Sequence, residues 1–169
     1  MNPLHWSTRQ LNFFGAVVCF GAIGYALYVQ YHMFMMPCPL CIFQRIAFAA
    51  AGSFFLVSAL HNPDSVTARR AYGMLTALSA LVGAAIAGRH VQIQLMPADQ
   101  APLCNSLGLD YMLDAMPLTD VVSKVLKGSG ECAKIDWTFL GFSMPMWTLA
   151  LYAGITVLAL YAAFKKNRD

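Results

Sequence analysis

Four long apolar stretches divide this sequence, and polar segments of very different length separate them. The first stretch covers residues 11–31 and carries no charged side chain. The others cover residues 41–60, 71–88 and 144–164. A helix needs about 20 mostly apolar residues to cross the hydrocarbon core of a bilayer, so each stretch is long enough to span a membrane. The pattern predicts four transmembrane helices.

The polar region before the last stretch, residues 89–143, contains one further helical pattern. Apolar residues recur there at helical spacing: Leu118, Val121, Val122, Val125 and Leu126. Lys124 and Lys127 fall off this stripe, Pro117 precedes it, and Gly128-Ser129-Gly130 ends it. The spacing predicts a short amphipathic helix. Such a helix can lie on the bilayer surface or pack on the helix bundle, and the pattern favours neither placement.

The composition agrees with a membrane location. Of 169 residues, 59% are hydrophobic and only 11% are charged, whereas a soluble domain averages about 25% charged residues. The formal net charge of +3 is too small to indicate a nucleic-acid partner. We therefore expect an all-α membrane protein, a four-transmembrane-helix bundle forming a single integral membrane domain over residues 1–169.

The distribution of basic residues predicts the orientation of the bundle. Six of them lie in the N-terminal segment, in the 61–70 loop and in the C-terminal tail: Arg9, Arg69, Arg70, Lys165, Lys166 and Arg168. Four spans place these three segments on one side of the membrane, and the positive-inside rule makes that side cytoplasmic. Both termini are then cytoplasmic, and the loops 32–40 and 89–143 are extracytoplasmic.

Five cysteines are present, and four of them belong to the outward-facing side. These four are Cys38, Cys41, Cys104 and Cys132, whereas Cys19 lies in the middle of the first span and is expected to be a small buried apolar residue. Disulfides persist on the oxidising side of a membrane. Four cysteines allow three pairings. Cys38–Cys41 is the natural local pair, which leaves Cys104 with Cys132.

The second span opens with a Cys-X-X-Cys motif, Cys38-Pro39-Leu40-Cys41, and Arg45 follows one helical turn later. Such a dithiol can close into a small ring or pass its electrons on. If the helix begins near Leu40, Cys41 lies in the first turn, where unpaired backbone N–H groups and the helix dipole favour a thiolate. Arg45, at i+4 from Cys41, shares its face and is a functional candidate because arginine is costly in an apolar span.

Less specific interpretations of these residues exist. A Cys-X-X-Cys motif can be half of a zinc site or two buried thiols, and an arginine near a helix end can simply extend its charge to the interface. Zinc ribbons use two close cysteine pairs, whereas Cys104 and Cys132 are far apart in the sequence, so we predict no metal. His90 ends the third span at the same depth as the motif, and it can also be an interface histidine without a role.

The stretch Cys-Pro-Leu-Cys-Ile-Phe-Gln-Arg, residues 38–45, resembles the signature of the disulfide bond formation protein B (DsbB) family. The resemblance covers nearly the whole chain. It includes Gly88-Arg89-His90, Ser129-Gly130-Glu131-Cys132-Ala133 and Met144-Pro145-x-Trp147. Gln44 stands where some members of the family carry an acidic residue, so we assign no role to it.

The resemblance implies a function in the bacterial inner membrane. Members of the family reoxidise a soluble periplasmic thioredoxin-fold oxidase, DsbA, and pass the electrons to membrane quinone. By resemblance, Cys104 and Cys132 exchange with a DsbA-like partner, and Cys38 and Cys41 reoxidise them. All four cysteines would then be periplasmic, and no nucleic acid is involved.

The quinone-facing residues also follow from the resemblance. Cys41, beside Arg45, would face the quinone, which is ubiquinone or menaquinone. Arg45 can polarise a quinone oxygen, because electrostatic stabilisation is strong in a site of low dielectric constant. His90 can bond a quinone oxygen or relay a proton.

Two other classes of protein share some of these features. Vitamin K epoxide reductase-like proteins also combine several spans, a Cys-X-X-Cys motif and a quinone. In that class, however, the motif resembles one embedded near the end of a late span, whereas here it opens the second span. The other class is a non-enzymatic membrane module with structural disulfides or a four-cysteine metal site.

Overall fold

The computed structural model describes residues 6–34, 37–97, 114–128, 130–135 and 137–165. Within these residues, four helices are long and apolar enough to cross a membrane. They are α1 (Thr8–His32), α2 (Pro39–His61), α3 (Val66–Gln94) and α7 (Met144–Phe164). The chain therefore has the expected architecture of a four-helix, all-α membrane protein.

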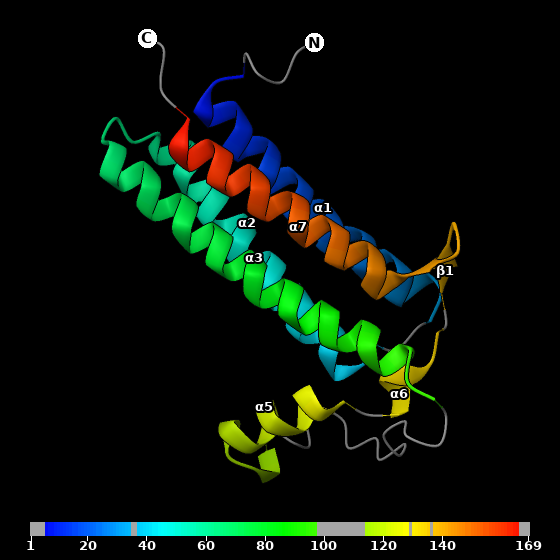
Figure 1. Ribbon diagram of the computed structural model, residues 1–169. Helices are drawn as coiled ribbons and strands as arrows, with labels where there is room; N and C mark the ends of the chain where they lie inside the picture. Colours follow the sequence, from blue (N-terminus) through cyan, green and yellow to red (C-terminus); the bar gives the residue numbers. More distant parts are fainter. Residues whose placement is uncertain (1–5, 35–36, 98–113, 129, 136, 166–169) are drawn as a thin grey trace.

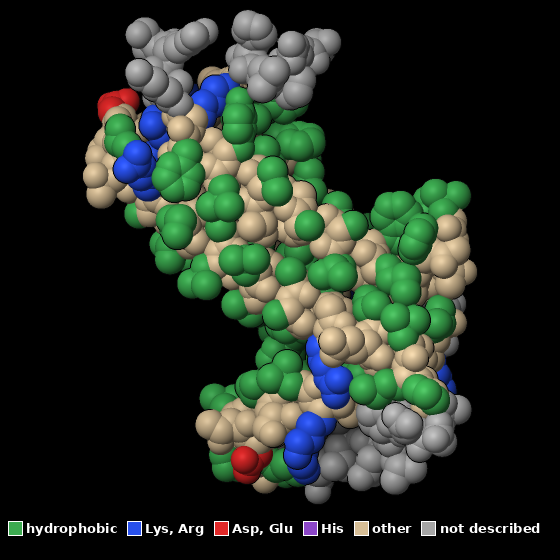
Figure 2. Space-filling view, viewed as in Figure 1, with side chains coloured by type: hydrophobic (Ala, Val, Ile, Leu, Met, Phe, Trp, Pro, Cys, Tyr) green, Lys and Arg blue, Asp and Glu red, His purple; other side chains and the backbone are tan. Residues whose placement is uncertain are grey.

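The four long helices lie side by side in one bundle (Figure 1), in which α3 packs on α7 and α2 packs on both α1 and α3. The start of α1, the end of α7 and the α2–α3 connection meet at one end of the bundle. The short elements that follow α3 lie at the other end, beside the start of α2. Apolar side chains cover the flank of the bundle (Figure 2), as expected of a surface that faces lipid.

The helix α3 is longer than the apolar run that predicted it. The run covers residues 71–88, but the helix begins at Val66 and continues through Arg89 and His90 to Gln94. An apolar run measures the hydrocarbon thickness, whereas the i→i−4 hydrogen bonds of a helix continue beyond it into polar surroundings. This extension carries His90 toward the start of α2.

Small residues let the helices approach closely in the centre of the bundle. Alanines from all four long helices form the central cluster, with Cys19 fully buried among them, as expected. The largest fully buried side chain is Tyr152, which stacks on Phe48 with ring centroids 4.1 Å apart. Gly83 faces the Tyr152 ring so closely that a Cβ there would lie 2.3 Å from Tyr152 Cε1. Packing of small residues against one aromatic ring thus sets the register of α2, α3 and α7.

The predicted amphipathic helix is present as α5 (Leu118–Lys127). Its residues Val121 and Val125 are buried against the end of the bundle, in a cluster with Leu40 and Ile93. The rest of the apolar stripe is exposed: Leu118, Val122 and Leu126. The helix therefore packs on the bundle with one edge of its stripe and leaves the other edge uncovered.

Two small elements complete the outer end, and the apolar pattern predicted neither of them. The four-residue helix α6 (Gly130–Ala133) follows α5. The strands β1 (Thr138–Phe139) and β2 (Phe142–Ser143) form an antiparallel hairpin just before α7. Its two turn residues, Leu140 and Gly141, have φ angles of 52° and 81°, the left-handed conformation that a two-residue hairpin turn requires.

Candidate functional site

The two cysteines of the Cys-X-X-Cys motif lie at the start of α2. Cys38 is the N-cap residue, and Pro39 occupies the first turn, where its fixed φ suits a helix. The two sulfur atoms are 3.3 Å apart, with the Cys38 thiol donating to Cys41 Sγ. A disulfide needs about 2.05 Å between sulfurs, so the structure describes the dithiol form of this pair.

The expected place of Cys41 is confirmed, because α2 begins at Pro39 and Cys41 lies in its first turn. The backbone N–H of Cys41 donates to the carbonyl oxygen of Cys38 at 3.0 Å. The Cys41 sulfur accepts a hydrogen bond from the thiol of Cys38.

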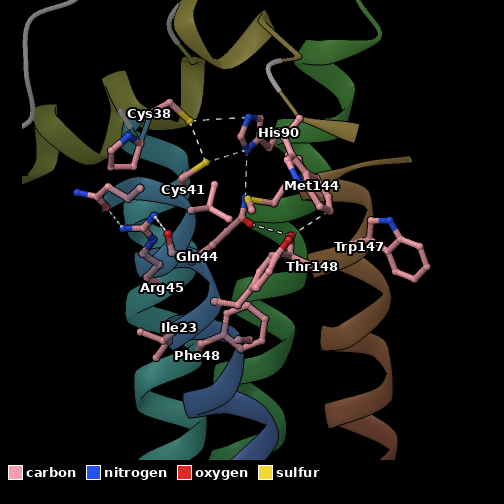
Figure 3. A pocket seen from close by; sticks show the side chains of 18 of the residues that line it. Ile23, Cys38, Cys41, Gln44, Arg45, Phe48, His90, Met144, Trp147 and Thr148 are labelled. Atoms are coloured by element: carbon pink, nitrogen blue, oxygen red, sulfur yellow. Dashed lines mark hydrogen bonds between the residues drawn. The ribbon is translucent and has the colours of Figure 1, made fainter. Parts of the chain in front are cut away.

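His90 reaches the two thiols from α3 (Figure 3). Its Nε2 lies 3.8 Å from Cys38 Sγ, and its Nδ1 lies 3.9 Å from Cys41 Sγ. The His90 side chain is 3% exposed. The sequence indicated only that His90 lies at a similar depth, whereas the structure places its ring against both sulfurs.

Arg45 extends from α2 toward α1. Its Nη1 donates to Gln30 Oε1 at 2.5 Å, and its Nη2 donates to the Ala26 carbonyl oxygen at 3.2 Å. The guanidinium of Arg45 thus lies against α1. It lines the same pocket as Cys41.

That pocket has a volume of about 420 Å³ and is lined by all four long helices, at the end of the bundle where α2 begins. Its walls are mostly apolar, with Ile23, Phe48, Trp147 and Leu151 among them. A few polar groups converge on it, which is typical of sites for small organic ligands. Those groups include Gln44, Arg45, His90 and Thr148.

Gln44 connects the site to α7. Its Nε2 lies 3.2 Å from His90 Nδ1, and its Oε1 accepts from the Thr148 hydroxyl at 2.8 Å. The Gln44 backbone carbonyl accepts from the Tyr152 hydroxyl at 2.6 Å. Gln44 is 4% exposed, so its amide is a buried polar group whose two ends both have partners.

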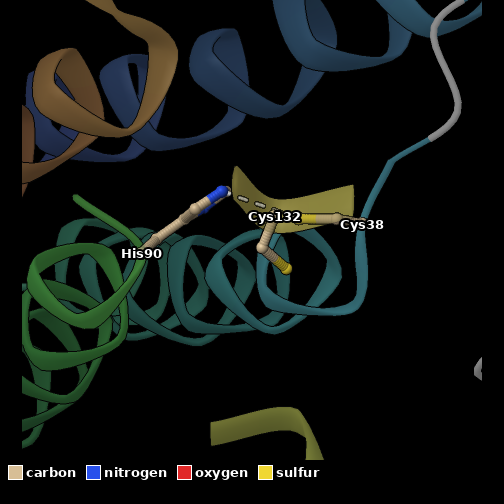
Figure 4. A group of neighbouring side chains, drawn as sticks. All are labelled: Cys38, His90 and Cys132. Carbon is tan, nitrogen blue, oxygen red and sulfur yellow. Dashed lines mark hydrogen bonds between the residues drawn. The ribbon is translucent and has the colours of Figure 1, made fainter. Parts of the chain in front are cut away.

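Cys132 on α6 is brought to the same place. Its sulfur, the Cys38 sulfur and a ring nitrogen of His90 all lie within 4.8 Å of one another, and the three side chains are buried (Figure 4). The outer region that follows α3 therefore contacts the Cys-X-X-Cys motif. Cysteine and histidine are also the donor types of zinc sites, so metal binding is the alternative to thiol chemistry for this cluster.

The model of the family described as disulfide bond formation protein DsbB matches residues 8–162. The chain is also similar to disulfide bond formation protein B of Xanthomonas euvesicatoria pv. vesicatoria (strain 85-10), with 47% identity over 169 residues, covering 100% of this chain and 98% of that protein. The chain belongs to the DsbB family. A further relative with the same name, from Xylella fastidiosa (strain Temecula1 / ATCC 700964), is 45% identical over 168 residues, covering 99% of this chain and 96% of that protein.

Membership of the DsbB family establishes the general role. The chain is a membrane oxidoreductase of disulfide bond formation. This result sets aside the vitamin K epoxide reductase-like class and the non-enzymatic module. It also agrees with cysteines as the chemical centre of the protein.

The structure places most of the predicted site residues of this DsbB-family protein together. Cys38, Cys41 and His90 are in mutual contact, and Cys132 lies beside Cys38 and His90. Cys104 lies outside the described residues, so its pairing with Cys132 stays a prediction.

Sequence reasoning missed several polar residues of the site, among them Gln30, Gln44 and Thr148. The available signal was a neutral polar side chain inside or beside an apolar span, where such a group needs a partner. Gln44 stands within the Cys38–Arg45 motif itself, and Thr148 follows Pro145 in the first turn of α7. Their partners lie on other helices, which the sequence does not reveal.

Proposed function

We propose that this protein reoxidises a soluble periplasmic thioredoxin-fold oxidase, a DsbA-like protein, and passes the electrons to membrane quinone. The observation that carries the proposal is the composition of one pocket. A thiol of the Cys-X-X-Cys motif, the guanidinium of Arg45 and the ring of His90 all line a largely apolar cavity at the start of α2. A lipid-soluble ring with two carbonyl oxygens fits such a cavity better than a polar substrate does.

The first step is exchange with the partner. A thiolate of the reduced partner attacks a Cys104–Cys132 disulfide, and the partner leaves oxidised while these two cysteines become thiols. The Cys38–Cys41 disulfide then accepts the same two electrons and two protons from them. The separation of at most 4.8 Å between Cys132 Sγ and Cys38 Sγ supports this transfer between the two pairs.

The second step returns the Cys38–Cys41 dithiol to a disulfide. A bound quinone supplies the acceptor for the two electrons and two protons that the dithiol releases. Cys41 is the thiol to react first, because its sulfur accepts a hydrogen bond from Cys38 and lines the cavity. Arg45 places a positive charge on the wall of that cavity, where it stabilises negative charge on sulfur or oxygen. The apolar walls exclude water from the reacting thiols.

We further propose that the whole chain, residues 1–169, is one integral domain of the bacterial inner membrane with both termini in the cytoplasm. Support comes from the arrangement of charge. The start of α1, the α2–α3 connection and the end of α7 lie together, opposite the end that holds the cysteine cluster (Figure 1). These segments and the start of α3 carry Arg9, Arg69, Arg70 and Lys165. The cysteines then face the periplasm.

A coupled assay tests the proposed function. The purified protein is placed in lipid nanodiscs with ubiquinone, and a reduced thioredoxin-fold dithiol oxidase is added. We expect the partner's disulfide to form at the rate at which quinone absorbance is lost, and we expect Cys41→Ser to abolish the continuous reaction. Partner oxidation without quinone consumption, or full turnover by Cys41→Ser, would overturn the proposal. Repeating the assay with menaquinone shows which quinone the protein prefers.

A further inference from the structure

Four side chains from three helices form a continuous chain of hydrogen bonds that ends at the Cys-X-X-Cys motif (Figure 3). The chain starts at Thr148 on α7, passes through Gln44 on α2 and His90 on α3, and reaches Cys38. Cys38 in turn donates to Cys41. Thr148 and Gln44 contact neither of the two sulfur atoms in these bonds, so any effect they have on the thiols is transmitted through His90.

The chemistry of the amide decides the direction of each bond in this chain. An amide oxygen can only accept and an amide nitrogen can only donate. The Thr148 hydroxyl has one proton and two acceptors, Gln44 Oε1 at 2.8 Å and the Pro145 carbonyl oxygen at 2.9 Å, so the two share it. With Gln44 Oε1 on this side, Gln44 Nε2 faces His90 Nδ1 at 3.2 Å. His90 Nδ1 must then accept. A neutral imidazole carries one N–H, so the proton of neutral His90 is on Nε2.

The other ring nitrogen of His90, Nε2, carries the proton and faces the sulfur of Cys38. His90 Nε2 lies 3.8 Å from Cys38 Sγ, so its N–H points toward that sulfur as a donor. Cys38 Sγ accepts from His90 and directs its own proton to Cys41 Sγ at 3.3 Å. Every group in the chain therefore donates in one direction, toward Cys41. Hydrogen bonds aligned in this way polarise one another and favour negative charge on the last acceptor.

We propose that Gln44 is a positioning residue: held by Thr148, its amide keeps the proton of neutral His90 on Nε2, the nitrogen that faces Cys38, and so aligns the hydrogen bonds toward Cys41. The packing around Gln44 supports this role. The Tyr152 hydroxyl holds the Gln44 backbone carbonyl at 2.6 Å, and the Tyr152 ring stacks on Phe48 one turn further along α2. Both contacts hold α2 and α7 in the register that the chain needs.

The neutral character of Gln44 matters for this arrangement. A carboxylate at residue 44 has no hydrogen-bond donor, so it would accept a hydrogen bond from an N–H at His90 Nδ1 instead of donating one to that nitrogen. The N–H of neutral His90 would then lie on the opposite side of the ring, and Nε2 would face Cys38 as an acceptor. Gln44→Glu, which is nearly the same size, should therefore reverse the tautomer of His90 without emptying the site.

Nitrogen NMR on the reduced full-length protein tests the inference directly. The protein is labelled with ¹⁵N-histidine, reconstituted in nanodiscs and measured at mildly alkaline pH, with His90→Asn used to assign the His90 signals. We expect Nδ1 to show the chemical shift of an unprotonated ring nitrogen and Nε2 that of a protonated one. A wild-type protein with the proton on Nδ1 would overturn the proposal, because the Gln44 amide would then be turned the other way.

Variants of Thr148 and a matched control separate positioning from folding. Thr148→Val removes the hydroxyl that orients the amide and should give mixed tautomer signals, whereas Thr148→Ser keeps the hydroxyl and should restore the wild-type spectrum. Thr156→Val is the control, because the Thr156 hydroxyl bonds only its own helix, at the Tyr152 carbonyl oxygen, and should change nothing. A wild-type spectrum for both Thr148→Val and Gln44→Glu would refute the positioning role.

The kinetic consequence rests on the proposed function, whereas the tautomer does not. Loss of one hydrogen bond in the chain should slow single-turnover oxidation of the Cys38–Cys41 dithiol at saturating quinone about fivefold in Thr148→Val. A shifted tautomer in a protein that never reduces quinone would reject the proposed function and keep this inference. Quinone turnover with an unshifted tautomer would reject the inference and keep the proposed function.

Discussion

The guanidinium of Arg45 on α2 is held by the side chain of Gln30 on α1, with Arg45 Nη1 2.5 Å from Gln30 Oε1. The Ala26 carbonyl oxygen on the same helix accepts from Arg45 Nη2 at 3.2 Å. Both acceptors are neutral, so they fix the plane of the guanidinium without cancelling its positive charge. That charge is thereby kept on the wall of the pocket that Cys41 also lines.

Removing the anchor should weaken the site without removing the charge. Gln30→Leu leaves the guanidinium with one fewer partner and lets it reorient, so we expect quinone-dependent turnover to fall about fivefold. Gln10→Leu is the matched control, because Gln10 caps the far end of α1, where its side chain bonds the Ser7 backbone. Turnover per folded molecule should stay unchanged in this control. Equal activities of the two variants would show that Gln30 does not position Arg45.

Replacing Arg45 itself should have a larger effect that depends on the substituent. Arg45→Lys keeps the charge but loses the planar fork of donors, and Arg45→Met loses both. We expect a modest fall in turnover for lysine and a fall of roughly a hundred- to a thousandfold for methionine, the cost of one preorganised charged donor. Exchange between the partner and the outer loop should survive in a single-turnover experiment. If Arg45→Met instead folds less well but keeps full turnover, the arginine only anchors the helix.

The resting protein should hold two disulfides, Cys38–Cys41 and Cys104–Cys132. The sulfurs of the first pair are already 3.3 Å apart in the dithiol form, so little movement closes the bond. Peptide mapping under non-reducing conditions checks the pairing. A dominant Cys41–Cys104 or Cys38–Cys132 bond in the resting protein would contradict it, although such a bond can form transiently once the partner is attached.

The orientation in the membrane should be visible from thiol accessibility. After mild reduction of intact cells, a membrane-impermeant thiol reagent should label the outer loops, at Cys104 more readily than at Cys38 because Cys38 is buried against His90 and Cys132. Cys19, which is fully buried in the middle of the bundle, should not be labelled. Mass spectrometry of the labelled peptides identifies the sites. Labelling of Cys38 and Cys104 that requires breaking the inner membrane would place both loops in the cytoplasm and reject the proposed topology.

The close contact between α3 and α7 predicts a stability effect. A Cβ on Gly83 would lie 2.3 Å from the Tyr152 ring, which is too short for a normal contact. Gly83→Ala should therefore destabilise the protein by about 1–3 kcal/mol, because the ring or the helices must move. Gly154→Ala is the control, since a Cβ there meets nothing within 4 Å. Thermal unfolding in detergent measures the difference, and equal stabilities would show that the helices separate easily.

The sequence by itself determined the elements and the reactive groups of this protein. The length of each apolar run predicted a membrane-spanning helix because a bilayer imposes that length. The apolar spacing within residues 118–126 predicted α5 because a helix repeats every 3.6 residues. The Cys38–Cys41 spacing identified a dithiol. All three signals are local, so no tertiary contact was needed to interpret them.

The tertiary structure alone decided which groups meet. The contacts of His90 with Gln44 and of Gln44 with Thr148 join α3, α2 and α7. The hydrogen bond from Arg45 to Gln30 joins α2 to α1. Apolar periodicity does not give the rotation and axial register of one helix against another. Those are set by where small residues such as Gly83 admit a large ring such as Tyr152. Because such packing is collective, the polar network at the site emerges only from the folded bundle.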